Sequence, residues 1–181
     1  MADIEIFADL LQTPRARAFL AHFAPMMRAR GFVRRDDFLP ESIPGLLGNL
    51  VMLERQAGTF RYRLVGSKIA GMHGRDLTGT TLADWPSTIA AALQAQYETA
   101  VATRAPILSH YAAPAYRGTR FEIVERRWEK IVLPIAFAGD EPNGVLVCAC
   151  ECADKDPLPA CWAGTPERGC WCAPPGKAQV A

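Results

Sequence analysis

The sequence is poor in net charge and in long apolar runs, and each shortage excludes a class of protein. Its 181 residues carry a net charge of only +1 at pH 7, which argues against broad electrostatic capture of nucleic acid or anionic membranes. The longest uncharged run, Trp85 to Tyr97, has 13 residues and is too short to span a bilayer. The first residues, MADIEIFADLL, lack the basic segment of a secretory signal, so we expect a cytoplasmic protein.

Catalytic signatures are also missing. The sequence shows no paired carboxylates set for acid–base work and no local signature of a Ser-His or Cys-His nucleophile. The GRDLTG segment, Gly74 to Gly79, lacks the lysine of a P-loop, so we interpret its glycines and Asp76 as turn geometry. Glu122, Glu125 and Glu129 alternate with arginines, which indicates a solvated, charge-paired sheet face. We therefore expect a protein that is not an enzyme.

The helices are predicted from capping residues and apolar spacing. Half of the residues are hydrophobic, which is enough to build a core. Thr13 and Pro14 predict the start of a helix that ends at Gly31, with Pro25 kinking or splitting it. The apolar stripe of this helix needs a cover, either the domain's own sheet or a second copy of the chain. A longer helix is predicted from about Ser87 to Arg104.

Five strands are predicted, at residues 48–54, 60–65, 107–116, 121–137 and 145–152. Pro114 is expected to interrupt the third strand, and a bulge or break near residues 125–128 is expected in the fourth. Sequential hairpins favour antiparallel pairing, with the helices on one face only. The predicted class is α+β: a five-stranded antiparallel sheet with a helical crossover on one face and an N-terminal helical extension.

The chain resembles PAS domains most specifically in FRYRLVGSKIAGMHGRDLTG, which begins at Phe60. The segment RRDDF from Arg34, with Ile43-Pro44 after it, comes before the first strand. Within the fourth strand, Trp128-Glu129-Lys130 leads into the apolar run IVLPI, residues 131–135. The resemblance is to a small stand-alone subfamily typical of alphaproteobacteria. It divides the chain into an N-terminal helical extension (residues 1–31), a PAS domain (32–152) and a Cys/Pro/Gly-rich tail (153–181).

The resemblance implies a sensory or regulatory module that binds a small ligand or a signalling partner such as a kinase. The alternatives are a ligand-free interaction adaptor and a metal-binding protein that uses the tail. The N-terminal helix is similar to extensions that pack in dimers, so a homodimer is expected. Candidate pocket residues, each with plain core packing as its alternative, are Tyr62, Leu64, Met72, Trp85, Tyr97, Val101 and Leu133, with His73 and His110 added as candidate haem ligands or proton-linked switches.

The resemblance does not identify a cofactor. Light-sensing relatives carry a flavin-reactive cysteine in the loop equivalent to Gly74–Thr78, and this loop has none, so a cysteinyl-flavin site is not expected. Haem-binding relatives commonly use a histidine on the long helix, and residues 87–104 contain none. His73 and His110 are the remaining candidates for haem iron, since neutral imidazole is a good iron ligand.

The six cysteines cluster toward the C-terminus. Cys148, Cys150 and Cys152 alternate along the last predicted strand and so share one side, and the first two are interpreted as core. Four thiolates are enough for a tetrahedral zinc site. The candidate ligands are Cys152, Cys161, Cys170 and Cys172. Their spacing is not that of two CxxC knuckles, and the alternative is a tail with reactive thiols.

Overall fold

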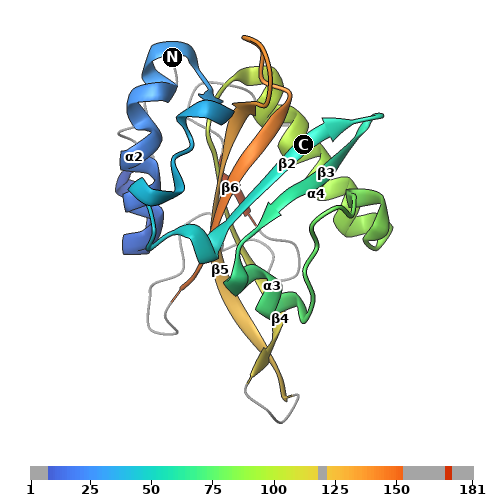
Figure 1. Ribbon diagram of the computed structural model, residues 1–181. Coiled ribbons are helices and arrows are strands. Elements are labelled where there is room, and N and C mark those ends of the chain that lie inside the picture. The colour runs from blue at the N-terminus through green and yellow to red at the C-terminus, as the bar shows by residue number, and fades with distance from the viewer. Residues whose placement is uncertain (1–7, 118–121, 153–169, 173–181) are drawn as a thin grey trace.

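One mixed, mainly antiparallel sheet forms the centre of the molecule (Figure 1). Its strand order is β3-β2-β6-β5-β4-β7, and β1 pairs with β5 in parallel. The computed structural model describes residues 8–117, 122–152 and 170–172. The strands are β1 (Val33–Arg34), β2 (Leu50–Gln56), β3 (Thr59–Val65), β4 (Ile107–Arg117), β5 (Glu122–Ala136), β6 (Gly144–Glu151) and β7 (Cys170–Cys172). Strands β2 to β6 are the five predicted ones, and their mutual pairing is antiparallel, which confirms the α+β class.

Strands β4 and β5 are more regular than expected. Their register runs without a shift from Ile107 opposite Val132 to Arg117 opposite Glu122, so the predicted break in β5 and the interruption of β4 are both wrong. Pro114 is tolerated because β7 pairs with β4 only as far as His110, which leaves a free edge beside the proline in the described part of the chain. The outer ends of β4 and β5 extend as a two-stranded arm below the rest of the sheet (Figure 1).

Helix α2 (Pro14–Arg30) covers one face of the sheet. The Thr13 hydroxyl accepts a hydrogen bond from the Ala16 amide at 3.2 Å, and Gly31 ends the helix with a φ of 79°, as the capping residues predicted. Pro25 lies on the exposed side and does not split the helix. The apolar stripe, which includes Phe19 and Phe23, is buried in one cluster with strand residues such as Leu146. The cover of this stripe is therefore the domain's own sheet.

Helices α3 (Ser67–His73) and α4 (Ser87–Thr103) cover the opposite face, so the expectation of helices on one face only is wrong. The sheet thus separates an α2 layer from an α4 layer, each with its own apolar core. Short 3-10 turns join the main elements: η1 (Arg35–Asp37), η2 (Pro40–Ser42), η3 (Leu47–Asn49) and η4 (Leu82–Asp84). Among the described helices, none has the length and apolar character needed to cross a bilayer. The proposed boundaries at residues 31 and 152 stay a prediction.

Candidate functional site

The α4 layer brings together most of the predicted pocket residues. Tyr62, Tyr97 and Val101 are buried in one cluster between the sheet and α4, and Met72 and Trp85 pack against it half-buried. The rings of Phe60 and Tyr97 meet edge to face at 5.4 Å between centroids. These residues come from β3, α3, the segment before α4 and α4 itself, so the layer is assembled from segments far apart in the sequence.

Leu64 and Leu133 are not part of this group, because both pack in the α2 layer. In β3, Phe60 and Tyr62 face α4, but the pairing with β2 shifts between Met52 and Leu53, so Leu64 lies opposite Met52 on the other face. An extra residue of this kind reverses the in-and-out alternation that follows it. In β5 it is Val132, not Leu133, that faces α4.

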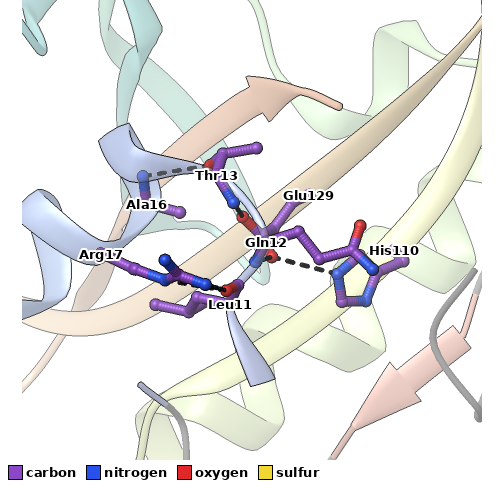
Figure 2. Close-up of polar contacts among 7 residues, drawn as sticks. All are labelled: Leu11, Gln12, Thr13, Ala16, Arg17, His110 and Glu129. Atoms are coloured by element: carbon purple, nitrogen blue, oxygen red, sulfur yellow. Dashed lines mark hydrogen bonds and ion pairs between the residues drawn. The ribbon is translucent and has the colours of Figure 1, made fainter. Parts of the chain in front are cut away.

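His110 also lies on the α2 side of the sheet, where it contacts the fully buried carboxylate of Glu129 (Figure 2). The distance from His110 Nε2 to Glu129 Oε1 is 3.1 Å. Glu129 also accepts hydrogen bonds from the Gln12 amide at 2.6 Å, the Thr13 amide at 2.9 Å and the Thr13 hydroxyl at 2.8 Å. The expectation that Glu129 belongs to a solvated, charge-paired face is therefore wrong.

Glu129 supplies the negative charge that the first turn of α2 lacks in its own sequence. Burial alone raises the pKa of Glu129, but the hydrogen bonds from His110, Gln12 and Thr13 outweigh it and hold this pKa below its usual range. The carboxylate is therefore ionised near neutral pH and fixes the start of α2 to β5. The sequence carried a signal for this burial, because Glu129 is in phase with Ile131 and Leu133 of the core.

Lys130, the next residue of β5, points into the α4 layer and was not among the predicted site residues. Its Nζ lies 5.5 Å from the ring centroid of Tyr97 and 5.5 Å from that of Tyr111. The residue is 7% exposed, and no hydrogen bond or charge of another described residue contributes to the shift of its pKa. Burial lowers the pKa of Lys130 to about 7. Contact with two aromatic faces compensates only part of the lost hydration.

Further polar atoms in the α4 layer are buried and unpaired among the described residues. They are Gln96 Nε2, Ser109 Oγ and Trp128 Nε1. Trp85 is not counted with them, because its side chain hydrogen-bonds Tyr62 and so lowers the pKa of Tyr62, against the larger effect of burial. Ser109 lies directly opposite Lys130 in the pairing of β4 with β5, so both side chains are on one face. Gln96 neighbours Tyr97 on α4 and is 1% exposed. Buried polar atoms usually have a partner, so ordinary core packing does not account for these atoms.

The three tyrosines of this layer lie close to one another. Burial raises the pKa of Tyr97, and nearby Tyr62 and Tyr111 raise it further. The same cause, burial, raises the pKa of Tyr62 and Tyr111. Their phenols therefore stay protonated, and the layer offers hydroxyl groups beside the Lys130 ammonium.

His73 lies at the edge of the α4 layer. Its ring is 5.0 Å from that of Trp85 in an edge-to-face contact. Burial lowers the pKa of His73, and the neighbouring charge of Arg75 acts in the same direction. His73 and His110 lie on opposite sides of the sheet, so the two candidate haem ligands are not brought together.

The turn after α3 has the geometry expected from its residues. Gly74 and Gly79 have φ values of 66° and 86°, and Asp76 Oδ1 accepts hydrogen bonds from the amide of Thr78 at 2.9 Å and from its hydroxyl at 2.8 Å. The interpretation of the GRDLTG segment as turn geometry is confirmed.

Cys148 and Cys150 lie in the core of the α2 layer, as their alternation indicated, with a distance of 3.7 Å between their sulfur atoms. The hydrogen bond with Cys150 and burial raise the pKa of Cys148, which keeps it a thiol. Cys161 lies outside the described residues, and the short strand β7 places the backbone of residues 170–172 beside β4. The described ranges contain no group of three or more His, Cys, Asp or Glu residues arranged for a metal ion. The zinc site stays a prediction.

A cleft of about 1220 Å³ opens where the start of α2, η3, α3 and the ends of β5 and β6 meet. Arg15 and Lys68 lie on its walls with exposed side chains, and neither has a carboxylate partner among the described residues. Arg126 also lines the cleft, but it forms an ion pair with Glu151. This surface is cationic and separate from the Lys130 side chain.

The comparison with protein families agrees with this architecture. A family model described as PAS domain matches residues 11–148, which includes α2, strands β2 to β5, the first part of β6 and both helices of the α4 layer. No curated protein matches the chain. The matched segment covers most of the sequence, and the chain therefore belongs to the PAS domain family, whose members are sensory and regulatory modules.

Proposed function

We propose that this PAS module senses a small molecule bound between the sheet and α4. The observation that carries the proposal is Lys130, a buried residue whose ammonium has no hydrogen-bond or carboxylate partner among the described residues and which shares the α4 layer with unpaired polar atoms. Removing a charge from water without a partner costs several kcal/mol. A bound molecule that pairs these groups offsets this cost, whereas a packed core gains nothing from them.

The sheet offers a direct route from the ligand to α2. Lys130 and Glu129 are neighbours on β5, and Glu129 holds the first residues of α2 through Gln12 and Thr13. A ligand that shifts β5 on the α4 side therefore also shifts Glu129, and with it the hydrogen bonds that hold the start of α2 on the other side. The output is a change in how α2 and its surroundings are presented to a signalling protein such as a kinase, without catalysis by the chain itself.

The mass and spectrum of the purified full-length protein test the proposal. A discrete mass excess in native mass spectrometry that disappears under denaturing conditions supports it, as does an absorption band of a bound chromophore. A native mass equal to that of the bare chain contradicts it and favours the ligand-free adaptor. The denatured sample is the internal control, because it reports the mass of the chain without non-covalent ligands.

The cationic cleft favours a second role, the docking of an acidic segment of a partner protein. Arg15 and Lys68 face the cleft without partners among the described residues, so they are available to carboxylates. The double variant R15E/K68E is expected to lose capture of the partner from lysate of the source cells. The variant R75E, which changes an exposed arginine outside the cleft, is the matched control. Equal capture by all three proteins contradicts docking at this surface.

The expected homodimer stays a proposal, and the apolar stripe of α2 is not available for it because that stripe packs on the chain's own sheet. A contact through α2 uses its outward side, where Ala18 and Ala21 are exposed. Sedimentation of A21R tests this contact, with A102R on the exposed side of α4 as the control. A dimer that survives in A21R argues against α2 as the interface.

A further inference from the structure

The unpaired groups of the α4 layer are all hydrogen-bond donors. Gln96 Nε2 and Trp128 Nε1 can only donate hydrogen bonds, and the Ser109 hydroxyl can donate or accept. The Lys130 ammonium adds three N–H donors. The unpaired buried amide oxygen among the described residues, Asn49 Oδ1, belongs to η3 and lines the cleft instead. The described residues of the α4 layer supply tyrosine hydroxyls but no anionic acceptor for these donors, because Glu129, the one buried carboxylate in the described part of the chain, lies on the other face.

The charge of the site limits the charge of that acceptor. Lys130 is the one lysine or arginine among the described buried residues, and the other groups named above are neutral. A single buried cation balances one negative charge, whereas a phosphate dianion would leave an uncompensated charge in a low-dielectric layer. Among common acceptors, a carboxylate matches both the donor geometry and the charge.

The walls around the donors determine what the carboxylate is attached to. The faces of Tyr97 and Tyr111 flank the Lys130 ammonium, and Trp128 lies opposite Tyr111 in the pairing of β4 with β5. Apolar residues such as Leu53 and Val147 complete the cluster. Such walls favour a small apolar or aromatic body over a sugar or a nucleotide.

We propose that the α4 layer binds a small organic monocarboxylate, whose carboxylate is held by Lys130 with Ser109 and Gln96 and whose body packs among the tyrosines. The proposal rests on the proposed ligand-sensing function and specifies its ligand class. Lys130 provides the charge and Ser109 the neighbouring hydroxyl donor. Gln96 provides the amide donor from α4, so the ligand joins the helix to the sheet.

Titration of the full-length protein with acetate, butyrate and benzoate, each against its own amide, tests the ligand class. Each amide keeps the shape of its acid but carries no charge. At least one acid is expected to raise the melting temperature and bind at least tenfold more tightly than its amide. Inorganic phosphate is included as the dianion and is expected to bind more weakly. Equal binding of acids and amides overturns the proposal, as does tighter binding of phosphate.

The variant K130M tests the anchor, because methionine keeps the apolar stem and removes the charge. It is expected to weaken the acid that binds best at least tenfold, while R28M, which changes an exposed arginine of α2 on the other side of the sheet, leaves its affinity unchanged. S109A and Q96L each remove one donor and are expected to weaken it several-fold, so the test does not depend on K130M folding. Affinities equal to that of the wild type in K130M, S109A and Q96L overturn the proposal.

The two proposals fail in different ways. A native mass excess together with indifference to carboxylates leaves ligand sensing intact and overturns the monocarboxylate class. A bare native mass together with no binding of any probe overturns both.

Discussion

Glu129 and Lys130 are consecutive residues of β5 whose buried side chains lie on opposite faces of the sheet and serve different layers. The Glu129 carboxylate receives the Gln12 amide at 2.6 Å, and the Lys130 ammonium lies 5.5 Å from the ring centroids of Tyr97 and Tyr111. Strand alternation makes this placement obligatory, since neighbouring side chains point in opposite directions. The strand β5 thereby connects the start of α2, which Glu129 holds, with the proposed ligand site.

Replacing Glu129 by glutamine is expected to destabilise the fold by about 2 kcal/mol, because amides and a hydroxyl buried at the start of α2 lose a charged acceptor. Urea unfolding measures the change. E141Q is the matched control, since Glu141 is exposed and pairs with Arg104 at the surface, where ion pairs contribute little. Equal stability of E129Q and E141Q contradicts the role of Glu129 in holding α2.

The pH dependence of this contribution has a defined sign. The pKa of Glu129 is lowered in the folded protein, so its stabilisation is complete above the unfolded pKa of about 4.3 and is lost as the pH falls through the folded value. The difference in unfolding free energy between wild type and E129Q is therefore expected to be constant from pH 5 to 7 and to shrink below about pH 4. Urea unfolding across this range measures it. A difference that grows in acid contradicts the assignment.

Lys130 is expected to have the opposite effect on stability. Burial lowers its pKa from 10.5 to about 7 in the folded chain, so between these values the unfolded chain binds more protons. Without ligand, the free energy of unfolding therefore rises with pH across that window, by up to about 1.4 kcal/mol per pH unit. K130M is expected to be more stable than wild type at pH 7 and to lack this rise. Thermal unfolding from pH 7 to 9.5 compares them; parallel curves for the two proteins contradict the burial of an unpaired ammonium.

Gly66, where β3 passes into α3, is required by close backbone contact. A Cβ atom there would lie 2.2 Å from the Leu47 carbonyl oxygen and 2.5 Å from that of Gly48. G66A is therefore expected to cost about 3 kcal/mol or more, since backbone must move. G71A is the matched control, because a Cβ at Gly71 in α3 meets nothing within 4 Å and alanine favours a helix by up to about 1 kcal/mol. Chemical denaturation measures the free energy of unfolding of both variants. Similar values would argue against the close backbone contact between Gly66 and η3.

The sequence by itself determined the elements and the family. Thr13, Pro14 and Gly31 delimit α2 through backbone preferences that act within a few residues, and the run from Phe60 to Gly79 carries the PAS resemblance. Local alternation also predicted that Cys148 and Cys150 share a core face. These features depend on neighbours along the chain, so they can be read without knowing the fold.

Only the tertiary structure decided which face each residue serves. The shift in the pairing of β2 with β3, between Met52 and Leu53, puts Leu64 on the face away from the α4 layer. In β5 the side chain of Val132, and not that of Leu133, points toward the α4 layer. Glu129 and Lys130 look like surface charges in sequence, because burial of a charge depends on partners remote in the chain: Thr13 for Glu129, Tyr97 for Lys130. Which face is covered, and by what, is a property of packing that no local pattern contains.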